Sequence, residues 1–248
     1  MIAEKDLLQH IHDRLQEMAE PAYAETSRRL LPSGVRPLMG VRVPRLKDLA
    51  RELVAAYGWE PIFNALLQSA TFEEQMLCGM VLGCGCKDGR RCLDVVDRFV
   101  RLVDNWSVCD SCCATFKLVQ RHRELFWPYL VSQAQSQDEY RQRFALVVWL
   151  SHYRAAVWRE EVLEALTQMT LRDYYAQMAA AWLLSIWVLD KPEATLKVIS
   201  SLKVPAEVGL MALQKMADSL RTPAEVRVRL SDLGKQLRAA NRNKSSMG

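Results

Sequence analysis

The sequence has no run of 18 or more apolar residues, so it predicts no membrane-spanning helix and no membrane partner. Its first residues, 1–6, lack the basic and then apolar segment of a secretory signal peptide. Glycine and proline are few, 10 and 9 among 248 residues, and long polar stretches are also few, which argues against a disordered chain. These absences predict a folded protein of the cytoplasm.

Alternation of apolar and polar residues over more than four positions is also missing, so no strand pattern competes with the helical ones. Apolar residues recur instead at steps of three and four. This spacing predicts a helical region over 2–31 that Pro21 interrupts, and a helix from Pro44 that Gly58 ends. The remaining helices are expected near 59–69, 72–83, 89–102, 105–119, 121–133, 138–151, 155–168, 172–189, 192–201, 205–219 and 223–239.

The predicted helices come in pairs with a period of about 33 residues, which falls in the range of helical repeat proteins. Capping boxes are expected at 71–74, 136–139 and 222–225, with a related pattern at 170–173. Pairs of this length predict an all-α solenoid of HEAT-like antiparallel helix pairs, whose concave groove would bind a partner. We expect one domain over 1–240 and a flexible C-terminal tail over 241–248.

Histidine is scarce, and the cysteines do not show the spacing of a metal site. All seven cysteines lie between Cys78 and Cys113, but no Cys-x-x-Cys pair is answered by a second pair at zinc-finger distance. The four histidines stand apart from this cluster in the sequence. The cysteines are therefore expected to be reduced, buried thiols that fill space as small apolar groups, and no metal is predicted.

The segment 105–110, Asn-Trp-Ser-Val-Cys-Asp, is typical of a helix start. Trp106 and Asp110 are four residues apart and therefore share one helical face. Asp110 lies about 160° around the axis from Val108, and we expect Lys117 to follow on the side of Asp110. An aromatic ring beside a carboxylate, away from the core, suits an electron-poor substrate. The alternative is a core tryptophan with a solvated or capping aspartate. The expected core stripe is Val108, Cys112, Phe116 and Val119.

Two later helices carry further candidates. The segment 141–150 is apolar on all sides from Phe144 onward, which predicts a central helix with Arg143 at its edge. A partly buried arginine needs an anionic partner, either a carboxylate of the protein or a phosphate. The segment 174–187 contains a run of three alanines at 179–181 that permits close helix packing. Trp182 or Trp187 could face the groove, although core packing is the default for each.

Taken together, these segments resemble the AlkD family of HEAT-like-repeat DNA glycosylases, which are DNA alkylation repair enzymes. The resemblance runs from the Gly-Val-Arg-Val-Pro segment at 40–44 to about Arg221. It rests on Asn-Trp-x-x-x-Asp at 105–110, on Arg-Phe-Ala at 143–145 and on Met-Ala-x-Ala-Trp-x-Leu at 178–184. The order and spacing of the three motifs fit the family. The resemblance implies a right-handed superhelical solenoid.

The resemblance also implies a function in base excision repair of alkylated DNA. The catalytic carboxylate would be Asp110, with Trp106 and Trp182 beside the lesion. Arg143 would contact double-stranded DNA, and we assign Lys117 to the same surface. The expected reaction is hydrolysis of the N-glycosidic bond of cationic purines such as N3-methyladenine and N7-methylguanine. It needs no cofactor, and a monomer is expected.

Two other functions fit the same sequence. A net charge of +4 is mildly basic, which permits a nucleic-acid partner without requiring one. A related protein could bind DNA through the same groove without hydrolysing it, and salt-sensitive duplex binding without base release would identify it. A protein-interaction scaffold would instead expose an apolar patch and would not bind DNA.

Overall fold

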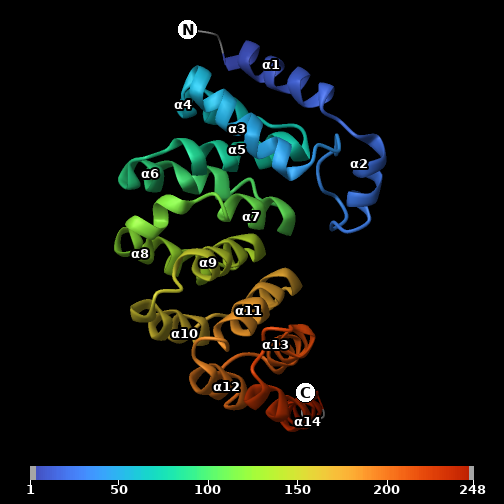
Figure 1. Ribbon diagram of the computed structural model, residues 1–248, viewed down its shortest axis with the longest axis vertical. Coiled ribbons are helices and arrows are strands. Elements are labelled where there is room, and N and C mark those ends of the chain that lie inside the picture. The colour runs from blue at the N-terminus through green and yellow to red at the C-terminus, as the bar shows by residue number, and fades with distance from the viewer. Residues whose placement is uncertain (1–3, 246–248) are drawn as a thin grey trace. The chain divides into compact units, whose positions relative to one another are not determined.

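The computed structural model describes residues 4–245, and helices joined by loops make up that range (Figure 1). The described chain contains fourteen α-helices, two 3-10 helices and no strand, which confirms the predicted all-α class. None of these helices is long and apolar enough to cross a membrane. The chain divides into two compact units, 1–129 and 130–248, with the boundary inside helix α8. A single domain over 1–240 stays a prediction.

The first unit is built around α5, which contacts α1, α3, α4, α6 and α7. Almost every side chain of α5 is buried, as expected for a helix without a polar face. The elements of this unit are α1 (Glu4–Glu17), α2 (Pro21–Arg28), α3 (Val43–Tyr57), α4 (Trp59–Leu66), α5 (Phe72–Gly85), α6 (Gly89–Val100), α7 (Trp106–Cys113), the 3-10 helix η1 (Lys117–Arg121) and the start of α8 (Arg123–Ala134).

The second unit is built around α11, which contacts α9, α12 and α13. Ala176, Ala179, Ala180 and Ala181 are all buried, as expected for small residues where α11 packs against neighbouring helices. The segment 144–150 of α9 is buried on all sides, as predicted. The remaining elements are α9 (Glu139–His152), η2 (Ala156–Trp158), α10 (Arg159–Thr167), α11 (Tyr174–Trp187), α12 (Pro192–Ser200), α13 (Ala206–Asp218) and α14 (Ala224–Ser245).

The repeat pattern is confirmed in its spacing, and one of the predicted caps forms. Helices were expected to begin near 72, 105, 138, 172 and 205, and α5, α7, α9, α11 and α13 begin at 72, 106, 139, 174 and 206. The capping box of Thr71 and Glu74 is present. The box predicted at 136–139 is wrong, because Asp138 directly precedes α9 and accepts from the backbone N–H groups of its first turn. The patterns at 170–173 and 222–225 are wrong too, since Asp173 makes no side-chain cap bond and the buried Thr222 hydroxyl has no hydrogen-bond partner among the described residues.

Two predicted boundaries differ from the structure. The helix expected over 105–119 ends at Cys113, and the chain turns through Thr115 and Phe116 into η1. The cause is a tertiary contact, described below, that periodicity cannot show. At the other end, α14 continues to Ser245 and includes most of the predicted tail, while 246–248 lie outside the described residues. Alanines at 239 and 240 favour this extension, because alanine is the strongest helix former.

Candidate active site

The start of α7 is fixed by a chain of polar contacts. The side chain of Asn105 is buried, and its Oδ1 accepts a hydrogen bond from the Val108 N–H at 2.9 Å. Its Nδ2 donates to Asp104 Oδ1 at 2.8 Å, and Asp104 Oδ2 pairs with Arg36 Nη1 at 2.6 Å. An N-cap held in this way sets where the helix begins and therefore which residues share a face.

The inner face of α7 is packed tightly on α5. Gly79 and Gly83 make this possible, because a Cβ at these positions would lie 2.5 Å from Cys112 Sγ and 2.0 Å from Thr115 Oγ1. The close approach at Thr115 coincides with the end of α7, since the Thr115 hydroxyl donates to the Cys112 carbonyl at 2.7 Å. The predicted burial is confirmed for all four residues of the expected core stripe, of which Val108 and Cys112 lie on α7 and Phe116 and Val119 lie beyond its end.

The opposite side of α7 carries Trp106 and Asp110, both partly exposed, as their spacing predicted. The Trp106 indole Nε1 donates to the Leu30 carbonyl at 3.3 Å. The Trp106 ring also lines an apolar cavity of about 110 Å³ together with residues of α2 and of the segment 30–41. One edge of this tryptophan is therefore held by the N-terminal part of the chain, a contact between residues 76 positions apart that the sequence did not reveal.

The segment that borders Trp106 is clamped by a buried carboxylate. Glu73 is 1 % exposed and accepts backbone hydrogen bonds from Met39, Gly40 and Val41 at 2.9, 2.7 and 3.2 Å. Gly40 has a φ of +91°, and a Cβ there would lie 2.3 Å from the Glu20 carbonyl oxygen. The residue type at 40 is therefore dictated by the backbone conformation and by contact with α2.

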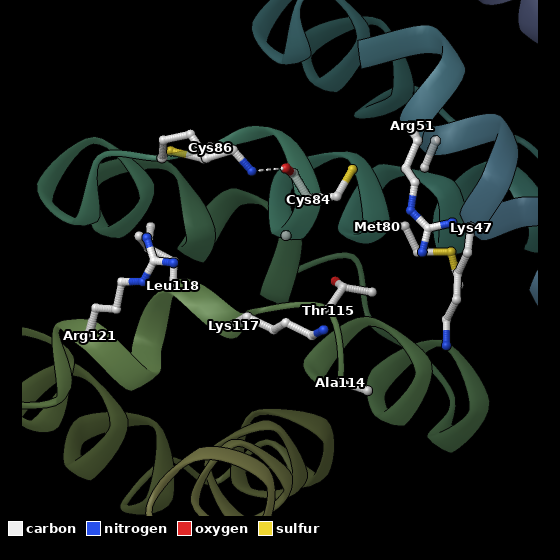
Figure 2. A pocket seen from close by; sticks show the side chains of 13 residues that line it. Lys47, Arg51, Met80, Cys84, Cys86, Ala114, Thr115, Lys117, Leu118 and Arg121 are labelled. Carbon is white, nitrogen blue, oxygen red and sulfur yellow. Dashed lines mark hydrogen bonds between the residues drawn. The ribbon is translucent and has the colours of Figure 1, made fainter. Parts of the chain in front are cut away.

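A basic pocket of about 530 Å³ lies in the same unit (Figure 2). Its cationic side chains come from α3, from the loop that follows α5 and from η1, and Figure 2 shows the α3 and η1 groups around one space. The five cations are Lys47, Arg51, Lys87, Lys117 and Arg121. The rest of the lining contains no acidic residue.

Lys117 lines this pocket from a different element than the one expected. Because α7 ends at Cys113, Lys117 does not continue the helical face of Asp110, and that part of the prediction is wrong. Lys117 lies at the start of η1 and is exposed. The pocket nevertheless adjoins α7, since Ala114 lines it and the Ala114 N–H donates to the Asp110 carbonyl at 3.2 Å.

Two of the five cations are engaged elsewhere. Arg51 Nη1 pairs with Asp48 at 2.6 Å, and Lys87 Nζ donates to the Cys84 carbonyl at 2.6 Å. Lys47, Lys117 and Arg121 have no carboxylate within salt-bridge distance in the described chain. A backbone carbonyl does not neutralise the charge of Lys87, so only Arg51 is balanced by a carboxylate, and the site has a positive potential, which attracts anions.

A thiol pair borders the basic pocket. Cys86 lines the pocket, and a hydrogen bond with the thiol of Cys92 lowers the pKa of Cys86 to about 7, although burial opposes this change. The same hydrogen bond, together with burial, raises the pKa of Cys92. Burial raises the pKa of four further thiols, those of Cys78, Cys84, Cys112 and Cys113, which disfavours their reactive thiolate form. Among residues 4–242, no group of three His, Cys, Asp or Glu side chains could hold a metal ion.

Arg143 and Trp182 belong to the second unit. Arg143 is 4 % exposed, and its Nη1 donates to the Tyr175 carbonyl at 2.6 Å, which connects α9 to α11. Trp182 is partly exposed on α11, whereas Trp187 is buried in the core. Between the two tryptophans of α11, Trp182 is therefore the one with surface available for a ligand.

The predicted site residues thus fall into two groups. The first unit holds Trp106, Asp110 and Lys117, and the second holds Arg143 and Trp182. The sequence interpretation missed Lys47 and Arg121. A signal was present, because Lys47 and Arg51, and likewise Lys117 and Arg121, are spaced four residues apart with the same charge.

These features define an all-helical protein with a carboxylate and an aromatic ring on one face of a helix, next to a basic pocket. The model of the DNA alkylation repair enzyme family matches residues 11–200, and the chain belongs to this family. Among curated proteins, none matches the chain. The family match gives the protein a role in DNA alkylation repair, with DNA as its substrate.

Proposed function

We propose that the protein is a DNA glycosylase that removes cationic alkylated purines, such as N3-methyladenine and N7-methylguanine, from double-stranded DNA. The observation that carries the proposal is the accessible position of Asp110 in a protein that belongs to a DNA alkylation repair family. Its carboxylate is on the accessible side of a short helix whose other side is locked onto α5 by Gly79 and Gly83. A carboxylate on so rigid a support suits electrostatic catalysis, which depends on groups that are already in place.

The chemistry follows from the charge of the lesion. Alkylation at N3 of adenine or N7 of guanine gives the base a positive charge, so it is already a good leaving group and needs no acid to protonate it. As the glycosidic bond lengthens, positive charge develops on the sugar. We assign to Asp110 the stabilisation of this charge and the orientation of the attacking water, as carboxylates do in glycoside hydrolysis.

The aromatic and basic residues have supporting roles in this proposal. Trp106 and Trp182 would lie beside the sugar, where the faces of their indoles attract positive charge. Arg143 and Lys117 would contact the DNA backbone. For Arg143, this contact must coexist with its bond to the Tyr175 carbonyl. We further propose that the helices form a right-handed HEAT-like solenoid, and that the protein acts as a cytoplasmic monomer without a cofactor.

The test is base release from duplex DNA that contains N7-methylguanine or N3-methyladenine, with the wild type compared with Asp110→Asn. The substitution keeps the size of the side chain and removes its charge, so we expect base release to fall by about 10²–10³-fold while duplex binding is retained. Asp94→Asn is the matched control, because Asp94 is an exposed aspartate on α6. It should release both bases at the wild-type rate.

Other outcomes separate the competing functions. Salt-sensitive duplex binding without release of either base would identify a DNA-binding protein that does not hydrolyse DNA. Absence of duplex binding at low salt would favour a protein-interaction scaffold. Release of a neutral base such as uracil at a comparable rate would contradict the requirement for a positively charged leaving group.

A further inference from the structure

The basic pocket of the first unit has a charge that the protein itself does not balance. Lys47, Lys117 and Arg121 border the cavity, and no carboxylate of the described chain pairs with them. Like charges around one cavity repel each other, and a bound anion relieves this repulsion. The two remaining cations, Arg51 and Lys87, are already held by Asp48 and by a backbone carbonyl. The pocket is therefore suited to an anion, and Lys47, Lys117 and Arg121 are the cations that no other contact of the described chain engages.

The rest of the lining favours a phosphate over a nucleobase. Apolar groups of Ala50, Met80 and Leu118 form part of the wall, and the Thr115 hydroxyl is used as a donor to the Cys112 carbonyl. These groups offer little to read the edge of a base. Lysine and arginine, by contrast, bind phosphate oxygens by charge, and the guanidinium fork can do so with two parallel hydrogen bonds.

The pocket also lies at a useful distance from Asp110. Ala114 borders the pocket and follows Asp110 by four residues, which corresponds to about 6 Å along the axis of α7. Each strand of duplex DNA advances about 3.4 Å per nucleotide. A phosphate in the pocket would therefore lie within a few nucleotides of a sugar that meets Asp110.

We propose that Lys47, Lys117 and Arg121 form a binding site for a single phosphodiester group of the DNA strand whose sugar faces Asp110. This inference rests on the proposed function for the identity of the strand. It adds two residues, Lys47 and Arg121, to the DNA-binding surface, and it assigns all three to the same phosphate.

The experiment measures the affinity for an undamaged fluorescent duplex as a function of salt concentration, with the triple variant Lys47→Gln, Lys117→Gln and Arg121→Gln. One phosphate contact contributes about 0.9 to the slope of log K against log salt. Loss of one shared contact should therefore lower the slope by about 0.9, although three charges are removed. The matched control removes three exposed cations outside the pocket, Lys5, Arg90 and Lys203, each changed to glutamine. The control should keep the wild-type slope.

Several results would overturn the inference. A triple-variant slope equal to that of the control would mean that the pocket does not touch DNA. A fall of about 2.7 would mean three separate phosphate contacts along a track. Titrations with inorganic phosphate and with a deoxynucleoside monophosphate test the remaining sources of the anion. Tight pocket-dependent binding of either one, with the duplex slope unchanged, would identify a small-molecule site, and the same result with a polyglutamate peptide would identify a protein partner.

The slopes and the base-release assay answer separate questions. If no base is released but the slope falls by about 0.9, the glycosylase proposal fails and the phosphate site stands. If base release depends on Asp110 while the triple variant keeps the slope of its control, the phosphate site fails and the glycosylase proposal stands.

Discussion

The buried carboxylate of Glu73 holds the segment 39–41 that borders Trp106, and a substitution of Glu73 tests this directly. Glu73 Oε1 accepts from Gly40 and Val41, and Oε2 accepts from Met39. Hydrogen bonds to a charged acceptor contribute about 1.5–3 kcal/mol each, against about 0.5–1.5 kcal/mol for neutral pairs. The carboxylate of Glu73 should therefore stabilise the segment 39–41 by several kcal/mol.

Glu73→Gln changes this site without changing its shape. If the amide oxygen replaces Oε1, two bonds remain but each is weaker by about 1 kcal/mol. The amide nitrogen then faces the Met39 N–H, so one bond is lost and a buried donor is left unsatisfied, at a cost of about 1–3 kcal/mol. The neutral side chain is easier to bury, which offsets part of the loss. The net expectation is a fall of about 3 kcal/mol in the free energy of unfolding.

Urea unfolding measures this change, and amide hydrogen exchange locates it. Protection should fall most at residues 39–41, because the Met39 amide loses its acceptor and the hydrogen bonds of the next two amides are weaker. Glu17→Gln, an exposed position on α1, is the matched control and should stay within about 0.5 kcal/mol of the wild type. A Glu73→Gln protein as stable as this control, with protection at 39–41 intact, would refute the reasoning.

Three further expectations follow from other contacts. Trp106→Phe should lower the free energy of unfolding by about 0.5–1.5 kcal/mol, measured in urea, because it removes the indole bond to the Leu30 carbonyl; no change would mean that this bond does not hold the ring. Burial raises the pKa of Glu74, but hydrogen bonds from a histidine and from two backbone N–H groups outweigh it and hold that pKa below its ordinary value. The stabilisation by the ionised Glu74 is thus complete above the pKa of the unfolded state and disappears as pH falls through the lower pKa of the folded state. The stability difference between the wild type and Glu74→Gln should therefore shrink below about pH 4. A constant difference from pH 7 to 3 would contradict this. Cys92→Ala should raise the pKa of Cys86 from about 7, since it removes the hydrogen bond that lowers this pKa most. Ultraviolet absorbance at pH 8 should then show less thiolate than in the wild type; an unchanged titration would place the low-pKa thiol elsewhere.

The properties of α7 show what the sequence could and could not predict. Its start, its core stripe and the outward position of Trp106 and Asp110 follow from periodicity, because one buried face is enough to orient a helix. Its end does not follow from periodicity. Thr115 meets Gly83 of another helix, and only the folded chain brings these two residues together. The prediction for Lys117 was therefore based on a continuous helix that the structure does not have, although Lys117 does line the basic pocket.

The surroundings of Trp106 and the basic pocket depend on residues that are distant in the sequence. Leu30 meets Trp106 across 76 positions, and Lys47 shares a cavity with Lys117 across a similar separation. Charge spacing within each segment was visible, but it cannot show which segments come together. The sequence also left open which tryptophan of α11 is accessible, and the structure shows that Trp187 is buried and Trp182 is partly exposed.

The carboxylate and the basic pocket are linked by electrostatics under the proposed function. Asp110 must approach a strand that is itself a polyanion. At separations of about 6–10 Å and an effective dielectric constant of about 20, one phosphate repels a carboxylate by about 2–3 kcal/mol. Cations that bind this phosphate from the same unit cancel the repulsion, so the carboxylate can remain ionised beside the sugar. Under the proposed function, a negative catalytic group in this position is favoured by a positive site nearby, and Lys47, Lys117 and Arg121 line such a site next to α7 without a carboxylate partner in the described chain.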